Sequence, residues 1–176
     1  MASAKQSPGD VGSGRPLEAF RDDARLLPAA DFEVRHGSGF LLLSSLPTRS
    51  ARDTFSTHLA FLDEPDAQTG ALATLVYPLQ SAHHILSIGR ARDNDVVIPD
   101  RSISRRHAFL KRVEGSRFLV LDAGSSNGTS VNGANVLTRG SGPPTPLGPG
   151  DTLRLGQLDF TFAHAAGLRE FAAKLR

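Results

Sequence analysis

The sequence predicts an all-β sandwich or barrel, preceded by an N-terminal extension and followed by a C-terminal helix. After Gly70, short apolar runs alternate with clusters of turn-forming residues, a spacing typical of many short strands. No helix-length periodic segment separates these runs, which excludes a doubly wound α/β fold. The predicted strands are residues 73–79, 84–88, 96–98, 108–113, 118–121, 129–131, 152–155 and 158–162.

The start of the chain predicts a tail and a short helix. Residues 1–16 are predicted to be disordered, because this polar stretch, rich in Gly and Ser, offers little to bury. From Leu17 to Leu27, apolar side chains recur at steps of three and four residues. That pattern predicts a short amphipathic helix, which Pro28 stops.

Four further stretches are expected to lack helix. Residues 32–34 and 40–43 are predicted to be extended, on either side of the turn-forming residues 36–39. The polar residues 47–70 predict an irregular linker, and the Pro-rich residues 142–146 predict a rigid connection.

The end of the chain predicts a closing helix, because Leu168, Phe171, Ala172 and Leu175 fall on one helical face. The predicted division of the chain is therefore a disordered tail at 1–16, an N-terminal extension at 17–70, a β-domain at 71–163 and a C-terminal helix at 164–176.

The composition narrows the class of protein. The 20 Lys and Arg residues nearly balance the 18 Asp and Glu residues, so neither nucleic acid nor a membrane is expected as a partner. The chain has no cysteine, which excludes a thiolate metal site, and no cofactor is expected. His83 and His84 are neighbours on a predicted strand and point to opposite faces, so they do not suit a shared metal site. With no secretory signal and no apolar stretch near the ~20 residues of a membrane span, a cytoplasmic protein is expected.

Five short motifs stand in order through the β-rich region. They are Gly89-Arg90, Asp93-Asn94-Asp95, Ser104-Arg105-Arg106-His107, Asn127-Gly128-Thr129 and Val131-Asn132-Gly133. Each motif alone is uninformative, but together, with strands between them, they resemble the forkhead-associated (FHA) family over about residues 73–162. The resemblance implies an FHA-type β-sandwich of about eleven strands, whose loops at one end bind a phosphothreonine peptide.

The residue types in these motifs suit a phosphate ligand. An arginine offers a planar fork that grips two phosphate oxygens, and a serine offers a compact hydroxyl donor. The resemblance assigns Arg90 and Ser104 to the phosphate, with Arg105 as a second cation. It assigns Asn127 to the peptide backbone beside the phosphothreonine, and Ser126 to a position that contacts the ligand.

Other residues are expected to support the site. The resemblance implies that His107 braces the loop that carries Ser104, and turn geometry explains the Asn-Gly pairs. The full set of expected supporting residues is Gly89, Asn94, His107, Gly128, Asn132 and Gly133. Cationic residues concentrate between residues 89 and 117, which favours an anionic partner. Within that stretch, Arg106, Arg112 and Arg117 are expected to face solvent.

Three functions are weighed. The first is a phosphothreonine-binding signalling module whose partner is a Ser/Thr protein kinase or its substrate. The second is a scaffold or oligomerisation protein that uses the same sandwich without phosphate, through the N-terminal extension and the C-terminal helix. The third, an enzyme, is disfavoured, because Ser104 and His107 are accompanied by neither a nucleophile elbow nor an acidic third member.

Overall fold

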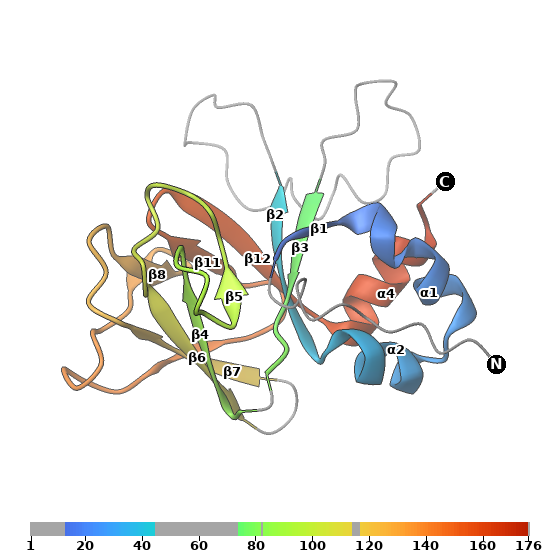
Figure 1. The fold of residues 1–176 in the computed structure, drawn as a ribbon. Helices are drawn as coiled ribbons and strands as arrows, with labels where there is room; N and C mark the ends of the chain where they lie inside the picture. The colour runs from blue at the N-terminus through green and yellow to red at the C-terminus, as the bar shows by residue number, and fades with distance from the viewer. Residues whose placement is uncertain (1–12, 45–73, 82, 114–116, 176) are drawn as a thin grey trace.

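Two β-sheets pack face to face, and a group of helices covers the outer side of one of them (Figure 1). The computed structural model describes residues 13–44, 74–81, 83–113 and 117–175. The predictions for residues 1–12 and 47–70 lie outside these ranges. The all-β sandwich and the C-terminal helix predicted from the sequence are confirmed.

The larger sheet has seven strands, all antiparallel to their neighbours. Their order is β1 (Arg15–Pro16), β3 (Thr74–Pro78), β2 (Gly39–Ser44), β12 (Leu158–His164), β11 (Thr152–Leu155), β8 (Thr129–Val131) and β9 (Ala134–Asn135). Strand β2 lies between β3 and β12, so the predicted domain boundary at residue 71 falls between two paired strands of one sheet.

The smaller sheet has five strands, and only its β4–β5 pair is parallel. Their order is β10 (Thr145–Leu147), β7 (Arg117–Asp122), β6 (Ala108–Val113), β4 (Ile85–Gly89) and β5 (Val96–Val97). An apolar cluster fills the core between the sheets, and Phe118, Phe160 and Phe162 are its largest fully buried members. Each of the eight predicted strands coincides with an observed one.

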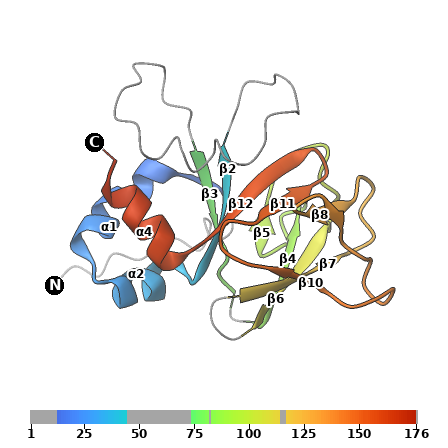
Figure 2. The same ribbon diagram turned by 180° about the vertical axis from the view of Figure 1, so that it is seen from behind.

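A second apolar cluster lies between the larger sheet and the helices η1 (Leu17–Phe20), α1 (Arg21–Leu26), α2 (Ala29–His36) and α4 (Ala165–Ala173). Seen from behind, α4 lies against α1 and α2 (Figure 2). Strand β2 faces both clusters, with Phe40 towards the helices and Leu41 towards the sandwich core. Burial on both faces explains why this strand reads as a continuous apolar run. The helix predicted after Leu17 forms as the 3₁₀ turn η1 followed by α1.

The prediction that residues 32–34 are extended is wrong, because they belong to helix α2. Phe32 and His36 lie one helical turn apart and are both buried, and the Phe32 ring lies 6.4 Å from the ring of Phe40 on β2. Val34 points away from this contact and is 84% exposed. Packing of Phe32 against β2 favours the helix. The local sequence of residues 32–34 does not reveal this contact and by itself predicts an extended segment.

Two further local predictions need correction. The last residues of the predicted disordered tail are ordered, because Arg15 and Pro16 form β1, which pairs with β3. The Pro-rich connection contains a strand, β10, in which Pro146 lies opposite Leu119 of β7. A proline is tolerated there because β10 is the edge of its sheet, where a missing N–H costs little.

Candidate functional site

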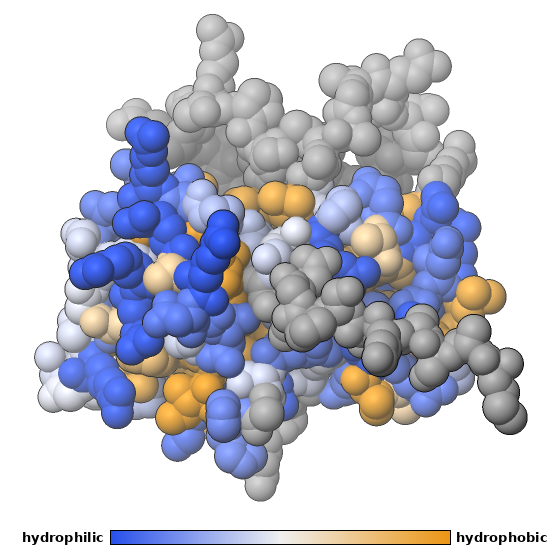
Figure 3. All heavy atoms as spheres, in the orientation of Figure 1, coloured by the Kyte–Doolittle hydropathy of each residue, from blue (hydrophilic) through white to orange (hydrophobic). Residues whose placement is uncertain are grey.

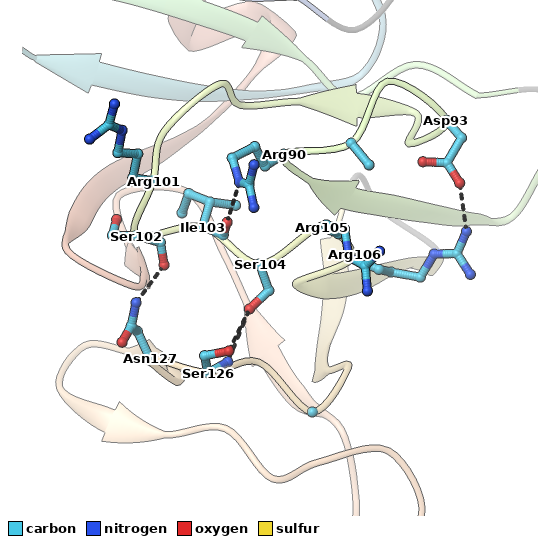
Figure 4. A pocket seen from close by; sticks show the side chains of 12 residues that line it. Arg90, Asp93, Arg101, Ser102, Ile103, Ser104, Arg105, Arg106, Ser126 and Asn127 are labelled. Atoms are coloured by element: carbon cyan, nitrogen blue, oxygen red, sulfur yellow. Dashed lines mark hydrogen bonds and ion pairs between the residues drawn. The ribbon is translucent and has the colours of Figure 1, made fainter.

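A cationic hollow of about 710 Å³ lies at one end of the sandwich. Three loops line it: those between β4 and β5, between β5 and β6, and between β7 and β8 (Figure 4). Its lining residues are Arg90, Ala91, Asp93, Arg101, Ser102, Ile103, Ser104, Arg105, Arg106, Gly124, Ser126 and Asn127. The structure therefore brings together all five residues that the sequence assigned to the ligand.

Arg90 leaves strand β4 at a point where two loops touch. The preceding Gly89 has no room for a side chain, because a Cβ there would lie 2.2 Å from the carbonyl oxygen of Arg105. The backbone N–H of Arg90 donates to the carbonyl of Ser104 at 2.9 Å, and its Nε donates to the carbonyl of Ile103 at 3.2 Å. The guanidinium is therefore fixed through Nε, and its two terminal nitrogens remain to bind a ligand (Figure 4).

Asn94 ties the first loop to the second. Its Nδ2 donates to the carbonyls of Ala91 and Arg105, each at 2.7 Å, and the side chain is buried. The second loop is also anchored from within, because Ile98 and Ile103 are both buried in the sandwich core. Two apolar anchors and one amide thus hold the backbone that presents Ser104.

His107 links the second loop to the third. The imidazole is fully buried; its Nδ1 accepts the backbone N–H of Ser104 at 3.0 Å, and its Nε2 donates to the carbonyl of Gly128 at 3.0 Å. Burial lowers the pKa of His107, against the raising effects of the Gly128 carbonyl and of nearby Asp122. The ring is therefore neutral near pH 7, the form that accepts at one nitrogen and donates at the other.

Ser104 and Asn127 make the direct contacts between the second and third loops. The hydroxyl oxygen of Ser104 accepts the backbone N–H of Ser126 at 3.0 Å, and the hydroxyl itself donates to the Ser126 hydroxyl over a long 3.5 Å. The Nδ2 of Asn127 donates to the carbonyl of Ser102 at 2.8 Å, which leaves the amide oxygen Oδ1 to accept from a ligand.

Sequence reasoning missed the buried carboxylate of Asp122, which shapes the third loop. It accepts hydrogen bonds from the backbone N–H groups of Gly124 and Ser125 and from the hydroxyls of Ser125 and Thr129, at 2.6 to 2.9 Å. Burial alone raises the pKa of Asp122, but these hydrogen bonds outweigh it and lower the pKa below 3.8. The available signal was an aspartate at a strand end, two residues before the turn-forming Gly124-Ser125-Ser126.

The expected supporting residues divide into two groups. Gly89, Asn94, His107 and Gly128 touch the loops of the hollow, and Gly128 has the positive φ of 79° that favours glycine. Asn132 and Gly133 do not line the hollow.

Asn132 supports a neighbouring turn instead. Its Oδ1 accepts the backbone N–H of Thr152 at 2.9 Å, and its Nδ2 donates to Asp151 at 2.8 Å. Positive φ values of 50° at Asn132 and 81° at Gly133 make the tight turn between β8 and β9. This pair therefore orders the end of the sandwich without facing the hollow.

The electrostatics of the hollow are strongly positive, with four arginines and one aspartate in its lining. Arg106, expected to face solvent, lies at the rim and pairs with Asp93 at 3.2 Å, although both side chains are more than half exposed. Arg101 was not predicted as a site residue. Over the half of the molecule that holds the sandwich, hydrophilic side chains predominate on the face seen in Figure 3. Among the described residues, no group of three His, Cys, Asp or Glu side chains could hold a metal ion.

A two-sheet sandwich whose end loops surround a fixed cationic hollow defines a ligand-binding domain. Residues 86–156 match the family model of the FHA domain, and the chain contains an FHA domain over these residues of the sandwich.

Several mycobacterial proteins are similar to this chain. The transcriptional regulatory protein EmbR of Mycobacterium tuberculosis is 30% identical over 128 residues, which cover 68% of this chain and 31% of EmbR. The glycogen accumulation regulator GarA of Mycolicibacterium smegmatis is 40% identical over 76 residues, which cover 43% of this chain and 44% of GarA. The matches therefore span less than half the length of these relatives.

Solved structures of FHA domains are also similar. One, from a study of phosphothreonine-dependent FHA domain interactions, is 26% identical, covers 72% of this chain and 96% of its own, and has a TM-score of 0.44. Another, Mycobacterium tuberculosis EmbR in complex with a low-affinity phosphopeptide, is 23% identical, covers 83% of this chain and 28% of its own, and has a TM-score of 0.45. None of the described helices of this chain is long and apolar enough to cross a membrane.

Proposed function

We propose that this FHA domain binds a phosphothreonine peptide of a partner protein, a Ser/Thr protein kinase or one of its substrates, in cytoplasmic signalling. The observation that best supports the proposal is the way in which the Arg90 guanidinium is held. Its guanidinium is held through Nε while its terminal nitrogens open into the hollow. A guanidinium fixed in this way loses little freedom when it grips phosphate oxygens.

The neighbouring groups complete a phosphopeptide site. The Ser104 hydroxyl can exchange its long 3.5 Å contact with the Ser126 hydroxyl for a phosphate oxygen, and Arg105 lines the same hollow as a second cation. The free Oδ1 of Asn127 suits an N–H of the peptide backbone. A threonine methyl that found an apolar notch would add about 0.8 kcal/mol over serine by burial alone.

The geometry supports binding rather than hydrolysis. A serine nucleophile needs a base within hydrogen-bond reach of its hydroxyl. Both ring nitrogens of His107 are bonded to backbone groups, and the ring meets the N–H of Ser104 rather than its hydroxyl. His107 is therefore a positioning residue for the loop, and we assign no catalytic role to the pair.

The test compares a phosphothreonine peptide with its unphosphorylated twin by isothermal titration calorimetry. Arg90→Ala is expected to weaken binding of the phosphorylated form by about 2–5 kcal/mol. Arg92→Ala is the matched control, since Arg92 is exposed and does not line the hollow. Equal binding of the two peptides to the unaltered protein would refute the proposal and favour a phosphate-independent scaffold.

A further inference from the structure

The four arginines that line the hollow differ in the hydrogen bonds and ion pairs that their side chains already make. Arg106 is paired with Asp93 at 3.2 Å, and Arg90 is tied to a backbone carbonyl through Nε. The side chains of Arg101 and Arg105 make no hydrogen bond or ion pair with any residue that the structure describes. Two of the four cations are therefore entirely open to a ligand, and Arg90 is open at its terminal nitrogens.

A count of charges shows that a single phosphothreonine does not neutralise all the positive charges of the hollow. The phosphate carries about −1.5 to −2 charges at pH 7. Arg90 and Arg105 supply two positive charges beside Ser104, and Asp93 already offsets Arg106. One positive charge, that of Arg101, is left without a counter-ion.

Arg101 is also separated from the other cations in space. It stands on the same side of the hollow as Ser102 and Asn127, while Arg106 stands on the opposite side (Figure 4). The adjacent acid along the chain, Asp100, forms no ion pair with Arg101; its carboxylate instead accepts the N–H and the hydroxyl of Ser102 at 2.8 and 2.6 Å. Arg101 is exposed, so its guanidinium is accessible to a bound peptide.

We propose that Arg101 forms a second anionic subsite, so that the preferred ligand carries a further carboxylate or phosphate close to its phosphothreonine. The acidic side chain would extend past Asn127, whose link to the Ser102 carbonyl joins the site to the loop that carries Arg101. This inference rests on the proposed phosphothreonine function and names the class of peptide that it selects.

The test uses a short peptide with a central phosphothreonine and neutral flanking residues, and a set of variants with one glutamate at each flanking position in turn. A second set carries phosphoserine in place of glutamate and separates the two sources of charge. At one or two adjacent positions, the added anion is expected to tighten binding roughly threefold to tenfold. The gain is expected to shrink in high salt, because Arg101 is exposed.

Two variants locate the effect. Arg101→Gln keeps much of the side-chain stem and is expected to remove the gain, while the phosphopeptide with neutral flanks still binds better than its unphosphorylated twin. Arg92→Gln, an exposed arginine outside the hollow, is expected to preserve the gain. A gain below twofold at every position, or an equal loss in both variants, would overturn the subsite alone. Failure of every phosphopeptide to bind better than its unphosphorylated twin would overturn the proposed function as well.

Discussion

The two ends of this molecule are held together by different forces. At the helical end, Phe20, Phe32 and Phe40 are fully buried in an apolar cluster between η1, α2 and the larger sheet. At the loop end, Ile98 and Ile103 anchor one loop in the core, and the links between and within the loops are hydrogen bonds from buried polar side chains, chiefly His107 and Asp122, to loop backbone.

The difference shows how the domain separates stability from recognition. Apolar packing is strong but non-directional, whereas a hydrogen bond fixes the position of the group it holds. The loops must place Arg90 and Ser104 accurately and stay open to a ligand, so they are held by directional contacts. We therefore expect substitutions at the helical end to change stability, and substitutions at the loop end to change binding.

The largest effect on stability is expected for Phe32→Ala at the helical end. Removing this fully buried ring leaves a cavity and is expected to cost about 3–5 kcal/mol of unfolding free energy, measured by denaturant titration. Phosphopeptide affinity below the unfolding midpoint should be unchanged. Val34→Ala, on the same helix but 84% exposed, is the control and should have little effect. A loss of affinity in the Phe32 variant would show that the two ends are coupled.

A smaller stability loss with a clear loss of binding is expected for His107→Ala. The change leaves the Ser104 N–H and the Gly128 carbonyl without their partner; water that enters the space left by the ring can bond one of them, so a loss of about 1–3 kcal/mol is expected. Because Ser104 is then free to move, phosphopeptide affinity should fall more than stability does. His84→Ala at an exposed position should change neither quantity. Unchanged affinity in the His107 variant would contradict the bracing role.

Mild acid is expected to loosen the loop end before the helical end. The pKa values of His107 and His36 are both lowered from 6.5, chiefly by burial, so the stability they contribute is complete above pH 6.5 and is lost as pH falls towards their folded values. A charged His36 gains an ion pair with Asp23, 2.8 Å away, which limits its cost. A charged His107 forms no ion pair with any described residue, although Asp122 is nearby, and its Nδ1 can no longer accept from Ser104.

Amide hydrogen exchange of the unliganded protein between pH 7 and pH 4.5 measures this order, after correction for intrinsic rates. Protection is expected to fall first at Ser104 and Ser126. Loss of protection in α2 first would contradict the comparison. Below pH 3.8 a further loss is expected, because the lowered pKa of Asp122 gives stability that is present above that value and disappears as the carboxylate is protonated.

The smallest effects are expected at exposed ion pairs. Arg106→Ala breaks the pair with Asp93 and is expected to change stability by at most about 0.2–1 kcal/mol. It also leaves Asp93 uncompensated at the rim, so phosphopeptide affinity should fall a few-fold, more at low salt than at high salt. Lys174→Ala breaks a comparable pair with Glu170 on the helical end and should leave affinity unchanged. If the Arg106→Ala and Lys174→Ala variants bound the phosphopeptide with equal affinity, the charge of Asp93 would have no effect on binding.

Most of the ligand-binding residues in the hollow could be predicted from the sequence, but the interactions that hold them could not. Turn chemistry and motif order placed Arg90, Ser104 and Asn127 on loops between short strands. The role of Asp122 was missed, because an aspartate at a strand end reads as an ordinary turn residue until its four donors are seen. Arg101 was missed because its place at the rim depends on how the β5–β6 loop folds back.

By itself, the sequence determined the alternation of short strands, the closing helix and the order of the binding loops, because these depend on neighbours within a few residues. Only the tertiary structure decided that residues 29–36 form a helix and that Arg15 and Pro16 join a sheet. It also decided which arginines of the hollow are not paired with a carboxylate and can bind a ligand. These outcomes depend on contacts between distant segments, such as Phe32 with Phe40 and Arg106 with Asp93. Local propensity is weak beside such packing, so the partner across the fold decides the outcome.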